Sequence, residues 1–454
     1  MTTDQKTQDS SPVSRRTVLG GALAGGAALA FGSTFGIRRA VAASRTLKVM
    51  SSATFMLGEA WKATSEPARD ETYLRASWEV LQAWRAKHPD VELQIEEVPW
   101  DQVTQNVILA SQSGTESDVV MVNDLNIPKL ARGGFLLPMD DFSSQWDEYN
   151  QHLLRGIASF DGKIYAAPWM TDCRHEMYWK SDFEAAGVTE PGSTWAEFTD
   201  QLAAVKETGV ANPYGFYAGN SVHTPTQTLL SQLWMLGGDV LDAEGRAALN
   251  SPEMVEVFGF YNTLMNDKKL ASPDLIAISD GGAFTDQLVS HKLAAQKNGA
   301  WVWQAVAAAG LSDKVGYFRT PRPNADAPDA TLSGFWAFQL PARTGIEDAQ
   351  QELAAEFALH MTSADSQAMI LAQTDGQLPT RPKAADTPQG ASKDDAWRFQ
   401  AAYAGEAGRG MPPAADAGLL FDQMRTAFQR YLSGDSTAEE ALSAAESSYN
   451  SQVG

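Results

Sequence analysis

The strongest constraint on the fold is an alternation of short apolar segments and amphipathic helices that begins near residue 46. A strand over 46–50 precedes a helix over 71–87, in which apolar residues recur at helical spacing. A second strand over 91–95 and a second helix over 102–113 follow, and the run over 118–122 is almost continuously apolar. Such a run is typical of a strand that is buried on both faces. The order predicts a parallel sheet covered by helices, and therefore an α/β fold.

Two helix starts further along the chain carry recognisable capping residues. Thr194 and Glu197 have the spacing of a capping box, in which each side chain binds the backbone N–H of the other residue. Ser251 followed by Pro252 has the pattern of an N-cap with a first-turn proline. Both sites therefore predict helices in the second half of the chain.

The last third of the chain shows one more strand–helix unit and two loop-like segments. We expect a strand over 335–340 that leads into a helix over 346–361. The segments 384–395 and 405–417 are rich in Pro, Ala, Gly and Asp, which is typical of surface loops. The C-terminus is expected to be helical.

The N-terminus carries the pattern of an export signal. Arg15 and Arg16 stand directly before a Gly- and Ala-rich stretch over 18–37, and a small-x-small tripeptide over 40–42 follows. This arrangement is typical of a twin-arginine signal peptide that is removed by cleavage. A retained membrane anchor is the alternative, but six glycines make the stretch weakly apolar for a membrane span. We therefore predict that residues 1–42 direct export through the twin-arginine translocase to the periplasm.

Charge and cysteine content narrow the class of partner. The full chain has a formal net charge of −21, and without residues 1–42, which hold five basic and two acidic residues, the charge is −24. A surface this acidic argues against nucleic acid and anionic lipid as partners. Cys173 is the single cysteine, so neither an intramolecular disulfide nor lipid attachment near the cleavage site is predicted. The histidines show no metal-ligand spacing, and no cofactor is expected.

A series of sequence blocks, spread over nearly all of the chain beyond the signal, carries a family resemblance. In chain order the blocks are Ala86–Val91 with Val98–Trp100, Ser113–Val120, Gly133–Asp140, Asp161–Pro168, Tyr178–Lys180 with Phe183–Gly187, Gly237-Gly238, Phe258–Leu264, Asn298–Trp301, Gly334–Trp336 and Leu378–Arg381. The chain resembles the extracellular solute-binding proteins of ABC importers, in the carbohydrate-type branch that includes maltose-binding protein. It departs from the family's usual pattern at Ser117, where proline is common, and at Trp179, which replaces an asparagine.

The resemblance implies a two-lobed periplasmic-binding-protein fold of the α/β class, with hinge crossovers and a central ligand cleft. The implied lobes are residues 44–168 plus 291–332 and residues 178–290 plus 340–454, with hinges near 168–178 and 332–340. It also implies a non-catalytic monomer that captures a sugar or related polyol and delivers it to the transmembrane permease subunits of an importer. The chain lacks a G-x-x-x-x-G-K-[ST] phosphate loop, as expected if the ATPase is a separate protein.

Four charged residues are candidates for polar contacts with a ligand. Asp124 follows the apolar run over 118–122, and open α/β sheets bind ligands at the carboxyl ends of their strands. Its alternative role is to cap the next helix. Asp172 and Arg174 lie in the first implied crossing, which lines the cleft in the family, although they could instead form a purely structural pair. Arg381 matches a recurrent cleft arginine of the family.

Three tryptophans are candidates for stacking against the apolar face of a sugar ring. The resemblance places Trp301 and Trp336 at cleft positions, and it places Trp234 at the cleft-facing end of its helix. Core packing is the common alternative for so large a side chain. Further possibilities are Trp100, Trp169 and Trp303.

Two other functions fit part of this pattern. Asp124 and Asp172 could be the paired carboxylates of a secreted glycosidase, which would place them about 5–9 Å apart. A ligand sensor for a signalling receptor would share the features of an importer's receptor. Tryptophans in the implied cleft favour a pyranose ligand, and the absence of a cluster of basic residues there argues against phosphorylated or carboxylate ligands. Arg174 and Arg381 nevertheless leave sugar acids and glycerol-phosphate-like ligands open.

Overall fold

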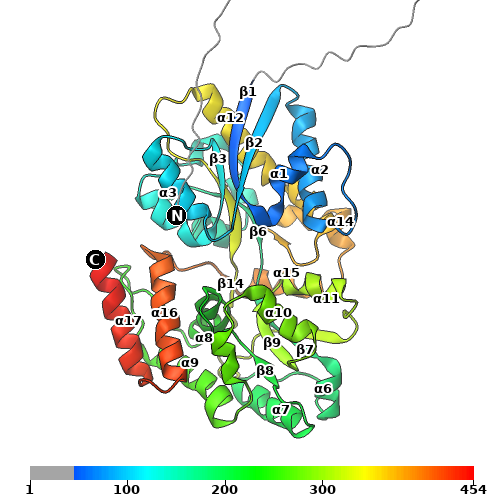
Figure 1. Ribbon diagram of the computed structural model, residues 1–454, viewed down its shortest axis with the longest axis vertical. Coiled ribbons are helices and arrows are strands. Elements are labelled where there is room, and N and C mark those ends of the chain that lie inside the picture. The colour runs from blue at the N-terminus through cyan, green and yellow to red at the C-terminus, as the bar shows by residue number, and fades with distance from the viewer. Residues whose placement is uncertain (1–44, 454) are drawn as a thin grey trace, which may run out of the picture. The chain divides into compact units, whose positions relative to one another are not determined.

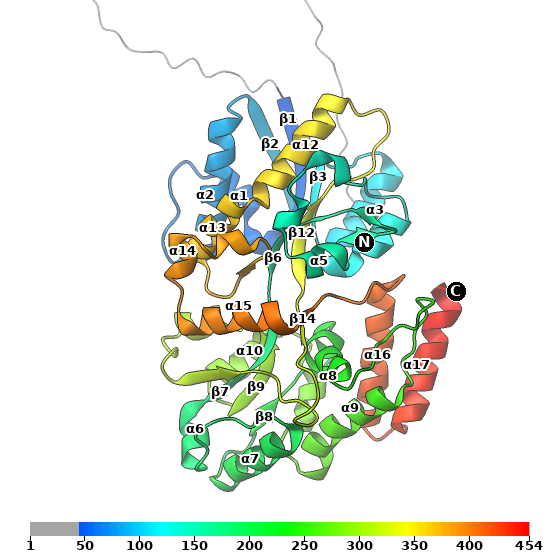
Figure 2. The same ribbon diagram turned by 180° about the vertical axis from the view of Figure 1, so that it is seen from behind.

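The structure is a computed structural model that describes residues 45–453. The predicted export signal over 1–42 lies outside these residues. Two main sheets with covering helices make up most of the described chain (Figures 1 and 2). Within that part of the chain, no helix is both long enough and apolar enough to cross a membrane.

The first sheet has six strands in the order β13-β6-β12-β3-β1-β2. They are β1 (Arg45–Ser52), β2 (Val91–Val98), β3 (Val119–Asn123), β6 (Ala167–Thr171), β12 (Phe335–Gln339) and β13 (Leu378–Pro379). β1 pairs in parallel with both β2 and β3, which confirms the predicted parallel arrangement of the first three strands. β12 then pairs antiparallel with β3 and with β6, and β13 pairs antiparallel with β6. The complete sheet is therefore mixed.

Helices cover both faces of this sheet, so β3 is buried on both sides as its apolar sequence predicts. Val119 and Met121 belong to one core cluster, whereas Val120 and Val122 belong to another. The helices packed around this sheet are α1 (Leu57–Lys62), α2 (Thr72–Lys87), α3 (Val103–Ser113), α4 (Ile127–Arg132), α12 (Asp348–Met361) and α13 (Ala364–Gln373). Smaller elements in the same region are α5 (Gln151–Arg155), β4 (Ser159–Phe160) and β5 (Lys163–Ile164).

The second sheet has four strands in the order β10-β7-β9-β8. They are β7 (Arg174–Trp179), β8 (Tyr214–Gly215), β9 (Ala295–Gly299) and β10 (Val315–Phe318). The helices in this part of the fold are α6 (Lys180–Ala185), α7 (Trp195–Glu207), α8 (Leu230–Met235), α9 (Pro252–Asn262), α10 (Gly281–Val289), α11 (Val302–Ala308), α15 (Asp395–Ala407), α16 (Ala417–Leu432) and α17 (Ala438–Val453). The predicted capping box at Thr194 and the predicted cap at Ser251 are confirmed at the starts of α7 and α9.

The chain passes between the two sheets three times. It leaves β6 and enters β7 through Asp172 and Cys173, returns from β10 to β12 through β11 (Thr331–Leu332), and leaves β13 towards α15. β11 pairs in parallel with β14 (Gly408–Arg409), which lies just beyond α15. Several separate chain segments therefore run side by side in the region between the sheets (Figure 2).

Two segment assignments differ from the sequence expectation. The family resemblance implies that 291–332 belongs with 44–168, but β9 and β10 pair with β7 in the second sheet. It also implies that 340–454 belongs with 178–290, but β13 pairs with β6, and α12 and α13 pack around the first sheet. Strand partners this far apart in sequence are chosen by tertiary packing, which no local pattern reports.

The two segments expected to be loops contain short regular elements. The stretch 384–395 includes the end of a 3-10 turn (Pro382–Ala384) and helix α14 (Pro388–Ala391), which Thr387 caps through its side chain. In 405–417, α15 extends to Ala407 and β14 follows before an irregular stretch leads to α16. The C-terminus is helical as predicted, because α16 and α17 pack against each other.

Candidate ligand-binding site

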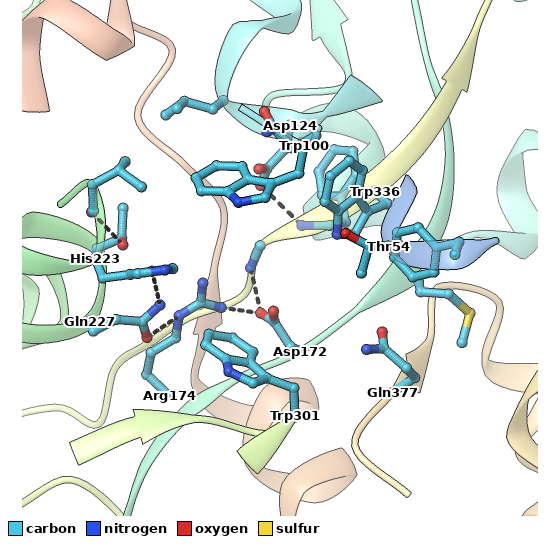
Figure 3. A pocket seen from close by; sticks show the side chains of 18 of the residues that line it. Thr54, Trp100, Asp124, Asp172, Arg174, His223, Gln227, Trp301, Trp336 and Gln377 are labelled. Atoms are coloured by element: carbon cyan, nitrogen blue, oxygen red, sulfur yellow. Dashed lines mark hydrogen bonds and ion pairs between the residues drawn. The ribbon is translucent and has the colours of Figure 1, made fainter. Parts of the chain in front are cut away.

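A cavity of about 620 Å³ lies where the carboxyl end of β3, the start of β12 and the first crossing meet residues from the second sheet (Figure 3). The first sheet side contributes the 3-10 turn after β1 (Ala53–Phe55) and Asp124, which directly follows β3. The second sheet side contributes the start of α11 and the π-helical turn before α8 (Thr224–Leu229). A smaller hollow of about 260 Å³ shares Trp100, Asn123 and Leu125 with the cavity.

Asp172 and Arg174 form an ion pair at the first crossing. Oδ1 of Asp172 also accepts the backbone N–H of Gly334 at 3.1 Å. The Arg174 guanidinium donates through Nε to Oε1 of Gln227 at 2.8 Å and through Nη1 to the carbonyl of Leu332 at 3.4 Å. Arg174 is buried, whereas the Asp172 side chain retains 20% exposure. The pair is therefore held in place by hydrogen bonds, and the Asp172 side chain remains accessible from the cavity.

Asp124 is held differently. Its Oδ2 accepts the backbone N–H of Phe335 at 3.1 Å, and the residue is only 3% exposed. Burial, and then the nearby charge of Asp172, raise the pKa of Asp124 to about 8, while Arg174 acts in the opposite direction. The side chain does not cap the following helices, so the capping alternative is wrong. Successive N–H groups at the start of β12 thus bind two acids from separate segments.

Trp301 forms one aromatic wall of the cavity. It directly precedes α11, and its ring lies against Gly299, where a Cβ atom would overlap the indole. A Cβ on Gly376 would come within 2.5 Å of the Trp301 Cα atom. The Arg174 guanidinium lies 5.2 Å from the centroid of the same indole. Two glycines and one buried arginine therefore fix the position of this ring.

Two further tryptophans line the cavity. The Trp336 ring packs edge-on against Phe55, with centroids 5.2 Å apart. Trp100 lies between β2 and α3, is 41% exposed, and has its ring centroid 6.3 Å from that of His223. His223 lies equally far from Trp301, and burial lowers its pKa to about 4. The cavity therefore combines indole faces with a few fixed polar groups.

Five of the seven sequence-predicted site residues line this cavity, namely Asp124, Asp172, Arg174, Trp301 and Trp336. The other two do not. Trp234 is buried beneath the guanidinium of Arg409, which lies 4.5 Å from the indole centroid. Arg381 is buried in an ion pair with Glu148 and lies 4.1 Å from the ring centroid of Tyr149. Both side chains are engaged in packing away from the cavity.

Several cavity residues cannot be predicted from the sequence. Of the three further tryptophans that are possible from the sequence, Trp100 lines the cavity, whereas Trp169 and Trp303 are buried and do not. His223 and Gln227 come from a segment without a recognisable motif. Other polar residues found only by the structure are Thr54, Gln304 and Gln377. Their contribution depends on the way distant segments meet, which sequence spacing does not encode.

The fold and cavity define an α/β binding protein with its site between two sheets, and comparisons with known proteins agree. The family model for bacterial extracellular solute-binding proteins matches residues 69–368. The chain therefore belongs to the bacterial extracellular solute-binding protein family.

Individual relatives are distant. Binding proteins of Brucella abortus and Brucella suis are 28% identical over 193 residues, which is 42% of this chain and 46% of theirs, so the chain spans about half the length of these curated relatives. A diacetylchitobiose binding protein of Streptomyces coelicolor is 25% identical over 292 residues, covering 62% of this chain and 64% of the relative. The maltose-bound structure of T. maritima MalE3 superposes with a TM-score of 0.73 at 20% identity, over 90% of this chain and all of the other. These likenesses show a shared fold.

Proposed function

We propose that this protein is the substrate-binding component of an ABC importer and that it binds a sugar or oligosaccharide in the cavity between its sheets. The observation that carries the proposal is the cavity itself, in which Trp301, Trp336 and Trp100 surround a fixed Asp172–Arg174 pair. Indole faces match the apolar C–H faces of a pyranose, and fixed ionic groups bind its hydroxyls. Family membership supports binding rather than catalysis.

The polar groups are arranged to bind hydroxyls without first having to move. Arg174 is already bound through Nε and Nη1, which leaves Nη2 without a hydrogen-bond partner among the described residues. The fixed guanidinium can therefore donate to a ligand oxygen at little entropic cost. Asp172 can accept a hydrogen bond from a ligand hydroxyl through Oδ2, since Gly334 and Arg174 both donate to Oδ1.

Contacts between the elements around the two sheets also support a mechanism in which the ligand favours a closed form. Lys129 of α4 forms an ion pair with Asp416 at 2.7 Å, and Gln304 of α11 donates to Thr72 of α2 at 2.6 Å. Both contacts join elements grouped around different sheets, on segments outside the crossings. A ligand that contacts both sheets adds to such contacts and shifts the population towards closure. The closed form would then dock on the permease.

The cellular setting is part of the same proposal. The Arg15-Arg16 pattern supports twin-arginine export to the periplasm. A ligand sensor for a signalling receptor remains a second candidate, because it would use the same cavity. A glycosidase would need turnover at Asp124 and Asp172, and membership of a solute-binding family does not support it.

Thermal unfolding in the presence of a sugar library tests the proposal directly. A ligand at about 100 times its dissociation constant stabilises the folded state by about 2.7 kcal/mol, which gives a measurable rise in Tm. We expect at least one mono- or oligosaccharide to raise the Tm, and mass spectrometry of native protein to find a co-purified sugar. If no carbohydrate shifts the Tm or co-purifies, the proposed function is wrong.

A further inference from the structure

The two acids of the cavity share a single guanidinium. Arg174 is bound to Asp172, and Asp172 also receives the backbone N–H of Gly334. Asp124 receives the N–H of Phe335 at 3.1 Å, and it forms no ion pair with any described residue. Because Asp124 is only 3% exposed, water solvates a charge on it poorly. The Arg174 guanidinium acts on Asp124 only at a distance, so the cavity contains one buried carboxyl group without an ion pair of its own among the described residues.

The walls near this carboxylate are suited to a cation. Figure 3 shows Asp124 on the same side of the cavity as Trp100 and Trp336, with Trp301 on the opposite side. An indole face attracts an ammonium group within about 6 Å of its centroid. A carboxylate and several indoles around one space are the combination that recognises a positively charged amine. A neutral hydroxyl gains far less from the same surroundings.

We propose that the ligand of this cavity is an amino sugar whose positively charged amine binds the carboxylate of Asp124. This rests on the proposed function, namely that the cavity binds a sugar. The guanidinium of Arg174 and the Oδ2 atom of Asp172 then bind hydroxyls elsewhere on the same ligand. An anionic sugar fits poorly, since the one guanidinium is already neutralised by Asp172.

The titratable groups that line the cavity together with Asp124 agree with this assignment. They are Asp172 and Arg174 from the first crossing and β7, His223 before the π-helical turn, and Tyr73 on α2. His223 is neutral near pH 7 because burial lowers its pKa, so it does not repel an amine. Burial raises the pKa of Asp124 to about 8, so the empty site holds a proton there. A bound ammonium would displace that proton, whereas a neutral sugar would leave it in place.

Calorimetry with three disaccharides of the same β-1,4-linked backbone distinguishes a ligand with a charged amine from a neutral sugar. Chitobiose carries amines at carbon 2, diacetylchitobiose carries acetamides there, and cellobiose carries hydroxyls. At pH 6, where the sugar amine is charged, we expect chitobiose to bind at least about tenfold more tightly than cellobiose. Titrations in buffers of different ionisation enthalpy should also show release of about one proton with chitobiose and none with cellobiose.

Asp124→Asn removes the ionisable carboxyl group at nearly constant shape and should abolish both the preference and the proton release. Glu96→Gln is the matched control, because Glu96 is exposed on β2 of the same sheet and undergoes the same carboxyl-to-amide change away from the cavity. We expect the control to keep the preference for chitobiose. Circular dichroism and Tm of both variants show whether folding is retained.

Mass spectrometry of the co-purified ligand gives a readout that does not depend on where the amine lies in the sugar. A ligand with a basic amine supports the inference even if chitobiose itself binds weakly. Equal or tighter binding of cellobiose together with a neutral or anionic co-purified sugar would overturn it, while leaving the proposed function intact. If no sugar binds and none co-purifies, the proposed function fails instead.

Discussion

β7 contributes one member to each of two pairs of opposite charges, Arg174 to one and Glu176 to the other, and the surroundings of the two pairs differ. Arg174 pairs directly with Asp172 and faces the cavity. Glu176 lies opposite Lys297 of β9, and both residues are fully buried. The guanidinium of Arg174 has several acceptors, whereas the Lys297 Nζ atom has no hydrogen-bond partner among the described residues.

The difference shows how burial alone fails to identify a functional charge. Glu176 accepts the hydroxyl of Tyr214 at 3.0 Å, and Lys297, at a distance, and the Thr320 side chain also favour its ionised form. Burial raises the pKa of Glu176 to about 7 and lowers the pKa of Lys297 to about 8. Charges that are taken out of water without full hydrogen bonding usually cost more than their attraction returns. Burial also raises the pKa of Asp172, but the cavity pair makes more hydrogen bonds than the buried pair, and the Asp172 side chain keeps 20% exposure at the cavity.

The largest expected effect comes from breaking the cavity pair. Arg174→Met removes a ligand donor and leaves Asp172 without its cation, so we expect sugar affinity to fall by about 3 kcal/mol, or roughly a hundredfold. Arg381→Met is the matched control, since it also removes a buried arginine from an ion pair but lies away from the cavity. Calorimetry with the sugar identified by thermal screening should show unchanged affinity for the control. Equal losses in both variants would contradict the placement of the site.

The second prediction concerns the buried pair. Replacing both members, as Glu176→Gln with Lys297→Met, should leave the free energy of unfolding unchanged or raise it by about 1–4 kcal/mol. Lys297→Met alone should be less stable than the double variant, because Glu176 loses the cation beside it. Urea unfolding of the wild type, both single variants and the double variant measures the coupling. A double variant less stable than either single variant would show that the pair stabilises the fold.

The third prediction concerns β9. In this strand Gly299 lies opposite Arg174, just as Lys297 lies opposite Glu176. In Gly299→Ala the new methyl group would overlap the Trp301 indole, so the ring must move. We expect sugar affinity to fall by about 1 kcal/mol, the scale of one aromatic contact. Gly259→Ala is the control, because that helical glycine has open space around it. Retained affinity in Gly299→Ala would show that Trp301 does not stack on the ligand.

The sequence predicted those features that are encoded locally. The apolar run of β3 and the capping box at Thr194 depend on neighbouring residues, and both were found in the structure. Asp124 could be placed at the cavity because it directly follows a parallel strand, and open α/β sheets bind ligands at the carboxyl ends of such strands. Trp234 and Arg381 were misplaced because block position says nothing about a packing partner such as Arg409 or Glu148.

The remaining features depend on contacts between distant segments. β9 pairs with β7 across more than a hundred residues, so sequence alone put β9 with the wrong segment. The register of that pairing also sets Lys297 beside Glu176 and Gly299 beside Arg174. The Arg174–Gly299 pair at the cavity and the Glu176–Lys297 buried pair each combine one residue of β7 with one of β9. Neither pair can therefore be recognised before the register of the two strands is known.

The smallest predicted effect is the pH dependence that the buried pair adds to stability. Between pH 4.5 and about 7 the folded state keeps a proton on Glu176 that the unfolded chain has lost, so this contribution to stability falls as pH rises. Between about pH 8 and 10.5 the unfolded chain keeps a proton on Lys297 that the folded state has lost, so stability rises again. The pair's contribution is therefore lowest near pH 7–8. Subtracting the unfolding free energies of the Glu176→Gln, Lys297→Met double variant from those of the wild type should reveal this minimum. A difference that instead peaks near neutral pH would mean that both groups are charged in the folded state and that their attraction stabilises it.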